Sequence, residues 1–237
     1  MTTVGTQNEA PREVWLKETL ARLPVGSRLL DAGAGEQRHK KYCMHLQYIA
    51  QDFAQYDGKG DSVGLQTGAW DQSTLDIEGD IAAVSEPDAS FDAILCVEVF
   101  EHIPHPVEAL KEFARLLKPG GSLILTAPFC SMTHFAPFHF YTGFSRYFYS
   151  HYLPLFGFEV AEMEFNGNYF EYLAQEIRRL PDIAARYAGR RSRSLHSIAL
   201  KLASRVMLKV LQGFTDADKG SSELLCFGTH IYAVKKA

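Results

Sequence analysis

The sequence lacks a hydrophobic run of the ~18 residues that a membrane-spanning helix needs. Its first ten residues are polar and show no basic start, apolar stretch or small-residue cleavage site, so we expect no secretory signal. The four cysteines are scattered and form no Cys-x-x-Cys pair, a pattern typical of reduced thiols. Together these absences favour a cytoplasmic protein without a membrane span.

An excess of positive charge is also missing. The 28 Asp and Glu outnumber the 24 Lys and Arg, which gives a formal net charge of −4. Nucleic-acid-binding proteins are usually strongly basic, and no reader module is recognisable, so we expect no nucleic-acid partner. What the chain does have is apolar content. Of its 237 residues 46% are hydrophobic, enough for a core that closes without disulfide or metal.

Short apolar runs alternate with stretches of helical spacing in the first half of the chain. Helices are predicted over 14–23 and over 107–117, the second from apolar residues at Val107, Leu110 and Phe113. Strands are predicted at 28–32, 47–51, 74–78, 91–97 and 122–127. This alternation indicates an α/β fold with a parallel sheet, in which ligands bind at the carboxyl ends of the strands.

The composition changes after Pro128. Residues 129–156 are rich in Phe, Tyr and His, and we expect an aromatic lid or pocket wall there, although most of these rings are individually as well explained as core. A strand (157–164), two helices (168–187 and 194–211) and a final strand (224–234) are predicted to follow. The expected organisation is an N-terminal helix in 1–25, a core in 26–164, a helical insertion in 165–223 and a last core strand in 224–237.

Charge is distributed unevenly in this second half. Between Arg178 and Lys209 there are nine Lys and Arg and one acidic residue, Asp182. Such a block could bind the phosphate of a nucleotide-linked sugar or lipid carrier. A solvated helix face or a homodimer contact is the favoured explanation, and the apolar stripe of the second helix leaves a partner or membrane-surface role open.

Glycine-rich or acidic motifs stand where the predicted strands end. Asp31-Ala32-Gly33-Ala34-Gly35 follows the first strand, and its glycines permit a tight turn that brings the backbone close to a ligand. Asp52 ends the second strand, where a carboxylate can accept hydrogen bonds from ribose hydroxyls. Asp80-Ile81 and the run from Glu98 to His102 follow the third and fourth strands. Taken singly, each is also explained as an ordinary turn or a solvated acid.

In this order and spacing the motifs resemble those of class I S-adenosylmethionine-dependent methyltransferases, over about residues 27–128. The resemblance implies a Rossmann-like, seven-stranded, mostly parallel sheet with helices on both faces and an antiparallel last strand. The helical insertion before that strand is a departure from the plain fold. S-adenosylmethionine is the implied cofactor, with Asp31, Gly33 and Gly35 at its amino-acid end. The residues expected to bind it are Asp31, Ala32, Gly33, Gly35, Asp52, Phe53, Asp80, Ile81, Glu98 and His102.

Methylation of a hydroxyl needs a base beside the acceptor, and the aromatic segment offers candidates. His139 and His134 lie just past the fifth predicted strand, with Tyr141 nearby, and imidazole titrates in the range that suits proton removal at neutral pH. The alternative is that these histidines only hydrogen-bond the lid. Our candidate catalytic residues are His139, His134 and Tyr141.

A metal site is not expected. His102 with His105, or His134 with His139, could supply nitrogen ligands. Pro104 interrupts the first pair, however, and no cluster of acidic residues accompanies the second in the sequence.

The sequence therefore predicts a methyltransferase that acts on a small molecule or glycan. We expect the methyl group to be transferred to an oxygen atom, and the basic block leaves open an acceptor that bears a phosphate group. Carbon or nitrogen methylation is the main alternative, and no Asn-Pro-Pro-Tyr motif of the amino-methylating subclass is present. A catalytically silent cofactor-binding scaffold is a second alternative. A nicotinamide oxidoreductase is a third, weakened because Arg38 stands where the dinucleotide fingerprint needs Gly or Ala.

Overall fold

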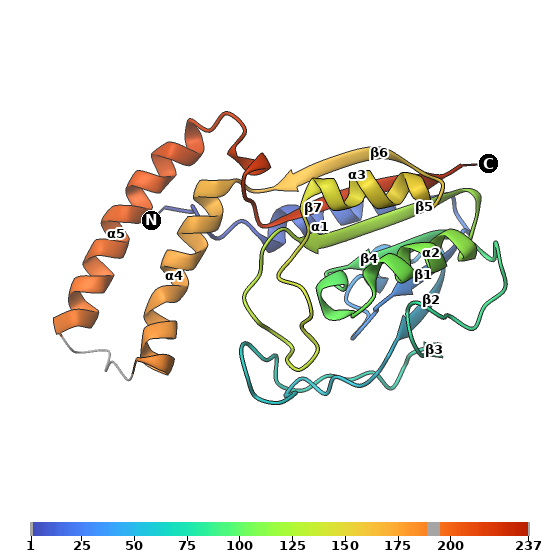
Figure 1. The fold of residues 1–237 in the computed structure, drawn as a ribbon, viewed down its shortest axis with the longest axis horizontal. Helices are drawn as coiled ribbons and strands as arrows, with labels where there is room; N and C mark the ends of the chain where they lie inside the picture. The colour runs from blue at the N-terminus through green and yellow to red at the C-terminus, as the bar shows by residue number, and fades with distance from the viewer. Residues whose placement is uncertain (1, 189–194, 237) are drawn as a thin grey trace. The chain divides into compact units, whose positions relative to one another are not determined.

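The computed structural model describes residues 2–188 and 195–236 (Figure 1). The chain divides into two compact units. The core unit consists of Val14–Glu164 and Gly228–Ala237, and the helical unit consists of Met1–Glu13 and Phe165–Phe227. Part of the predicted basic block, residues 190, 191 and 193, lies outside the described residues.

A seven-stranded sheet with the strand order β3-β2-β1-β4-β5-β7-β6 organises the fold. Its strands are β1 (Arg28–Ala32), β2 (Gln47–Asp52), β3 (Ile77–Glu78), β4 (Phe91–Val97), β5 (Leu117–Pro128), β6 (Phe158–Asn166) and β7 (Gly228–Lys235). Strands β1 to β5 pair in parallel, whereas β7 runs antiparallel to β5, with Thr126 opposite His230. The predicted α/β fold, with its seven-stranded and mostly parallel sheet and antiparallel last strand, is confirmed.

Helices cover both faces of this sheet. The core helices are α1 (Glu9–Leu20), α2 (Pro106–Leu116) and α3 (Arg146–Leu155), with short 3-10 turns at Lys40–Tyr42 (η1) and Phe100–His102 (η2). Successive strand residues point to opposite faces. Leu30 accordingly packs in a cluster with Phe113 of α2 and Tyr149 of α3, and its neighbour Leu29 packs with Leu16 of α1. This two-sided burial explains why the central strands read as continuous apolar runs.

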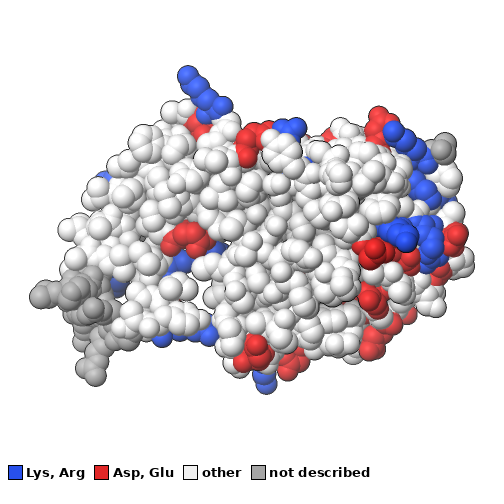
Figure 2. Space-filling model, in the orientation of Figure 1, with Lys and Arg blue, Asp and Glu red and all other residues white. Residues whose placement is uncertain are grey.

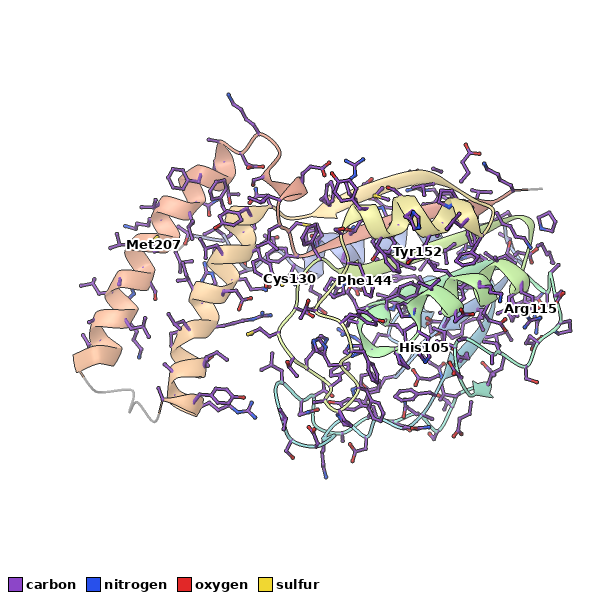
Figure 3. All side chains as sticks on the ribbon, in the orientation of Figure 1. His105, Arg115, Cys130, Phe144, Tyr152 and Met207 are labelled. Carbon is purple, nitrogen blue, oxygen red and sulfur yellow. The ribbon has the colours of Figure 1, made fainter. Side chains whose placement is uncertain are left out.

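The aromatic segment 129–156 has two parts. Its first part is a loop, and its second part is largely the helix α3, whose Tyr149 and Leu153 are fully buried in the core. Phe144 is buried there too, with its ring centroid 4.7 Å from that of Phe148 (Figure 3). Since these rings are covered by the fold, the loop of residues 129–143 is the part that remains available to line a site.

The helical unit is built around α4 (Tyr169–Tyr187) and α5 (Leu195–Asp216). The Asn168 side chain caps α4 by accepting hydrogen bonds from the backbone N–H groups of Phe170 and Glu171, each at 3.0 Å. The N-terminal segment packs against α4, because Arg178 donates hydrogen bonds to the carbonyls of Val4 and Thr2, both at 2.7 Å. One residue of the predicted basic block thus has a structural role within this unit.

Several predicted elements differ in extent from the observed ones, among them β5, which begins at Leu117 rather than at residue 122. Helix α1 begins at Glu9 rather than at residue 14, and β3 is only two residues long. The last strand begins at Gly228, not at residue 224, because Ser221–Glu223 forms a 3-10 turn (η3) and the ring of Phe227 packs on Gly167. The buried Cys226 and Phe227 therefore pack within the helical unit rather than in a strand, and Leu224 is exposed.

Charged side chains of both signs lie together at the end of the core unit near the C-terminus (Figure 2). Arg115, in the last turn of α2, donates two hydrogen bonds to Glu112, at 2.6 and 2.8 Å, and one to Asp88 at 2.7 Å (Figure 3). This end of the sheet is opposite to the carboxyl ends of the strands. Among the described residues, no helix combines the length and apolar character that crossing a membrane requires.

Candidate active site

The turn after β1 is shaped by two glycines with left-handed backbone. Gly33 has φ +82° and Gly35 has φ +51°. The backbone N–H groups of Gly33 and Ala34 both donate to the carbonyl of Gln51, at 2.9 and 2.8 Å, which ties the turn to the end of β2. A Cβ at position 33 would overlap the side chain of Val99. Only glycine therefore allows this close approach of the backbone to the carboxyl end of β4.

Asp52 closes the turn from the end of β2. Its buried carboxylate accepts hydrogen bonds from the backbone N–H of Gly35 at 2.9 Å and of Ala54 at 3.0 Å, and from the Gln72 side chain at 3.1 Å. A carboxylate can accept about four hydrogen bonds, so these three leave one acceptor position open. The Gln72 side chain, which fills one of the three, comes from the loop between β2 and β3. Phe53, the next residue, places its ring edge against Phe138, with centroids 4.9 Å apart.

Asp31 is the buried acid of β1. Burial raises its pKa to about 7 and the neighbouring Asp52 carboxylate adds to the shift, whereas a hydrogen bond donated by the Tyr48 hydroxyl opposes it. A positively charged ligand group beside Asp31 would offset this burial. The structure thus brings Asp31, Gly33, Gly35 and Asp52 to one edge of the sheet, as the sequence predicted.

Asp80 and Ile81 follow β3 and have unequal environments. The exposed Asp80 accepts a hydrogen bond from the backbone N–H of Ala82 at 2.9 Å. Ile81 is 5% exposed and belongs to the main core cluster. Their proposed place beside an adenine remains a prediction.

A loop between β2 and β3, which the sequence analysis did not assign to the site, covers the glycine turn. The ring of Trp70 stands 2.9 Å from where a Cβ on Gly35 would lie. Trp70 also contacts Tyr56 and Phe135 edge-on, with centroids 5.2 and 5.3 Å apart. Backbone hydrogen bonds join this loop to the loop after β5, including those from the Leu65 N–H to the Thr133 carbonyl at 3.1 Å and from the Phe135 N–H to the Leu65 carbonyl at 3.0 Å. The available signal was Trp70 itself, one of only two tryptophans, in an otherwise polar stretch.

Glu98 marks the end of β4 with a left-handed backbone, φ +54°. Its side chain accepts a hydrogen bond from the Thr126 hydroxyl at 2.9 Å, and its backbone N–H donates to the Thr126 carbonyl, also at 2.9 Å. Non-glycine residues rarely adopt this conformation, and such strain concentrates at functional sites. The chain then turns into η2, which carries Glu101 and His102.

Glu101 is the centre of a group of histidines. Its side chain is 1% exposed, and burial raises its pKa, an effect that the neighbouring His134 opposes. The Oε1 atom of Glu101 lies 3.6 Å from Nε2 of His102 and 3.7 Å from Nε2 of His134. The Glu101 carbonyl accepts hydrogen bonds from the backbone N–H groups of Phe140 and Tyr141, at 2.8 and 3.2 Å. The loop after β5 is thereby fixed against η2.

Three histidines, His102, His134 and His139, meet at this point, each offering a ring nitrogen within 4.8 Å of the others. Burial lowers the pKa of His102 to about 3 and that of His139 below its usual value. Burial also acts to lower the pKa of His134, but its interactions with Glu101 and with the Met132 carbonyl outweigh burial and raise it. The candidates His134 and His139 are thus brought together with His102.

Tyr141, the third candidate, has a different orientation. Its hydroxyl donates a hydrogen bond to the Pro104 carbonyl at 3.1 Å, and its ring packs near Phe144 at 5.4 Å. The structure engages this hydroxyl with backbone, so a part for Tyr141 in proton transfer remains a prediction.

The structure removes one of the two reasons for which the sequence predicts no metal site. No acidic residue is close to His134 and His139 in the sequence, but Glu101 lies beside His134 in space. His105, the other predicted nitrogen ligand, is exposed at the N-cap position of α2 (Figure 3).

A doubly wound sheet with a glycine turn after β1 and an acid ending β2 defines a Rossmann-like nucleotide-binding site. A family profile described as "Methyltransferase domain" matches residues 30–125. A ubiquinone biosynthesis O-methyltransferase of Xanthomonas axonopodis pv. citri is 37% identical over 117 residues, 48% of each chain, so this chain spans about half the length of that relative in the match. A demethylmenaquinone methyltransferase of Mycobacterium sp. is 30% identical over 174 residues, 72% of this chain and 69% of the relative. The crystal structure of an S-adenosylmethionine-dependent methyltransferase from Archaeoglobus fulgidus has a TM-score of 0.57 at 15% identity, covering 95% of this chain and 93% of that one.

The chain belongs to the class I S-adenosylmethionine-dependent methyltransferases. It is an enzyme of this class, and its cofactor, S-adenosylmethionine, supplies an electrophilic methyl group. The residues fit such a group on two observations. The left-handed Gly33 and Gly35 give the turn after β1 backbone without side chains, which a ligand can approach closely. The buried Asp31 carboxylate suits a cationic amino group.

Proposed function

We propose that this methyltransferase transfers the methyl group of S-adenosylmethionine to a hydroxyl oxygen of a small aromatic compound. The observation that carries the proposal is the cluster of His102, His134 and His139 on the loops that follow β4 and β5, with the buried Glu101 beside the first two of them. In a doubly wound sheet the reacting groups gather at this edge, beside the nucleotide. A cluster of imidazoles there suits an acceptor that must lose a proton.

On the cofactor side, we assign the buried Asp31 and the turn at Gly33 and Gly35 to the amino-acid end. Asp52 would accept a hydrogen bond from the ribose, with Gln72 giving up its place on the carboxylate. Asp80 and Ile81 would border the adenine. Tyr48 holds the Asp31 carboxylate in place through its hydroxyl.

On the acceptor side, the chain's residues would orient the hydroxyl in line with the methyl group and remove its proton. The oxygen–carbon bond forms as the carbon–sulfur bond breaks, and the hydroxyl proton passes to the histidine cluster. His139 is the first candidate to receive it, because both of its ring nitrogens are buried without a hydrogen-bond partner among the described residues. A correctly placed base contributes about 10²–10⁴-fold to the rate.

The aromatic surroundings support a flat acceptor. Phe135 stacks on His102 with centroids 4.8 Å apart, and Phe138 meets Phe53 at 4.9 Å. Such rings exclude water and stack on an aromatic substrate. The names of the relatives point the same way, because ubiquinone biosynthesis includes O-methylation. A glycan or a phosphate-bearing acceptor remains the alternative, which the basic block of the sequence between Arg178 and Lys209 would favour.

A methyl-donor consumption assay tests the proposal. The protein is incubated with S-adenosylmethionine and, separately, with catechols and other phenols, nucleotide-linked sugars and amines, and each product is identified by mass spectrometry and NMR. We expect turnover on a phenol and a methoxy product. Turnover confined to amines or sugars would contradict the aromatic oxygen acceptor, and cofactor binding without turnover on any acceptor would favour a scaffold.

Carbon methylation of a quinol ring is the second candidate function. It is favoured by the demethylmenaquinone methyltransferase relative, whose match extends over more of the chain than the O-methyltransferase match does. The same NMR measurement separates the two, since a methyl group on a ring carbon and a methoxy group give different signals.

A further inference from the structure

The hydrogen bonds of the histidine cluster fix which ring nitrogens carry lone pairs. Nδ1 of His102 lies 2.6 Å from the Phe138 carbonyl, and Nδ1 of His134 lies 2.8 Å from the Met132 carbonyl. A carbonyl only accepts, so both Nδ1 atoms carry the proton and donate. In the neutral rings both Nε2 atoms are consequently left with a lone pair.

These lone pairs converge on a carboxylate. The Nε2 atoms of His102 and His134 lie 3.6 and 3.7 Å from the same oxygen of Glu101, too far for hydrogen bonds. His139 adds a third ring nitrogen within 4.8 Å of the other two. Two imidazole lone pairs thus lie beside the Glu101 carboxylate, and the ring of His139 lies beside both imidazoles, an arrangement of electron donors that a cation would stabilise.

A single proton does not satisfy this arrangement. A proton shared between Glu101 and His134 leaves Nε2 of His102 and both nitrogens of His139 without a partner, and these atoms are buried and unpaired among the described residues. The Oε2 atom of Glu101 is likewise buried without a partner. Buried polar atoms are rarely left in this state.

We propose that His102, His134, His139 and Glu101 bind a divalent transition-metal cation. Three imidazoles and one carboxylate form a donor set that suits Zn²⁺ and its neighbours in the first transition row. The backbone carbonyls of Phe138 and Met132 act as the outer partners that orient metal-binding histidines. In a tetrahedral site with bonds of about 2.0–2.1 Å, ligand atoms lie about 3.3 Å apart. The Glu101 distances of 3.6 and 3.7 Å are close to this value, and the histidine nitrogens, within 4.8 Å of one another, would move closer together on binding.

Binding of the cation does not depend on the proposed function. Only the role of the cation in catalysis rests on that function. An acceptor hydroxyl bound to the cation loses its proton to solvent more readily, because the cation stabilises the oxygen anion. The anion then forms the bond to the methyl carbon as the carbon–sulfur bond breaks. His139 becomes a ligand in this arrangement rather than the proton acceptor.

Metal binding is measured on the untagged, full-length protein after EDTA treatment and dialysis. We expect calorimetry with Zn²⁺ to give one equivalent per chain, and Co²⁺ to give a visible absorption band typical of four- or five-coordinate nitrogen and oxygen ligands. His134→Ala and the nearly isosteric Glu101→Gln are expected to weaken Zn²⁺ binding by at least about 100-fold. His105→Ala, which changes an exposed histidine outside the cluster, should bind as the unmodified protein does.

Two outcomes overturn the inference. One is the absence of a stoichiometric site in the unmodified protein. The other is unchanged Zn²⁺ affinity in Glu101→Gln, which keeps the test decisive if His134→Ala does not fold. Binding of S-adenosylhomocysteine, measured in parallel, separates this result from the proposed function. A protein that binds the metal but transfers no methyl group to oxygen contradicts only the proposed function. Full turnover by the metal-free enzyme contradicts the catalytic role of the cation.

Discussion

Glu101 and His134 lie on different segments, yet their side chains meet with Oε1 and Nε2 3.7 Å apart. Glu101 belongs to the turn after β4, and His134 belongs to the loop after β5. The Glu101 side chain is buried, and His134 forms a cluster with His102 and His139. The pair of Glu101 and His134 joins the two strand ends between which the reacting oxygen would lie.

Glu101→Gln and His139→Ala should therefore impair methyl transfer without impairing cofactor binding. We expect each variant to lower kcat by at least about tenfold, because each removes a group that handles the acceptor proton or its oxygen. The dissociation constant for S-adenosylhomocysteine should stay within about twofold, and His105→Ala serves as the control. Turnover of His139→Ala close to that of the unmodified enzyme would remove His139 from the reaction.

The buried carboxylate of Asp31 predicts a pH dependence of cofactor binding. Its pKa is about 7 in the folded protein, against 3.8 ordinarily, so the folded protein retains a proton that the unfolded chain loses as pH rises. Stability therefore falls between about pH 4 and 7 and levels off above. A cationic ligand group beside Asp31 lowers its pKa and releases that proton on binding.

The affinity for S-adenosylhomocysteine should consequently rise with pH up to about 7, by at most about tenfold per pH unit. Calorimetry between pH 5.5 and 8, in buffers with different ionisation enthalpies, measures both the affinity and the released proton. Asp31→Asn should bind more weakly and with little dependence on pH. A variant that keeps the full pH slope would show that another group titrates.

The close approach of Gly33 to Val99 predicts a large effect of a single methyl group. Gly33→Ala introduces a Cβ that overlaps Val99 and a left-handed backbone that alanine disfavours by about 1 kcal/mol. We expect at least about tenfold weaker binding of S-adenosylhomocysteine because the turn must shift. Gly26→Ala is a matched control, since Gly26 has nearly the same φ, +80°, but open space around it. Equal losses in both variants would assign the effect to backbone strain alone.

The sequence predicts the parts of this fold that are determined locally. β1 and β4 have the predicted bounds, because their side chains are buried on both faces and read as unbroken apolar runs. The glycine turn, which directly follows β1, and Asp52, which ends β2, were predictable because they adjoin recognisable strands. The contact of Glu101 with His134 was not, because it depends on the loop after β5 folding back so that Phe140 and Tyr141 hydrogen-bond to the Glu101 carbonyl. Trp70 was missed because a long loop without periodicity places it over the turn.

Arg115 predicts a change in stability that leaves the site untouched. Arg115→Ala removes both hydrogen bonds to Glu112, a carboxylate that is 9% exposed and also accepts from the backbone N–H of Val84 at 2.9 Å. We expect the free energy of unfolding to fall by about 2–3 kcal/mol, because a largely buried charge loses its partner. Lys111→Ala, on the same helix but in an exposed pair with Glu108 at 3.9 Å, should change it by at most about 0.5 kcal/mol. Denaturant unfolding measures both, and equal effects would show that the Glu112 pair is unimportant.

The fluorescence of Trp70 should report binding at the cofactor site. Its ring stands over the turn at Gly35, so a ligand in the turn must change its surroundings, whereas Trp15 is buried against His230 with ring centroids 4.9 Å apart. Since these are the only two tryptophans in the sequence, the change in emission on adding S-adenosylhomocysteine should persist in Trp15→Phe and disappear in Trp70→Phe. Calorimetry on both variants shows whether each still binds. A change that survives in a binding-competent Trp70→Phe would place the ligand elsewhere, because only Trp15, on the α1 side of the sheet, would remain to report it.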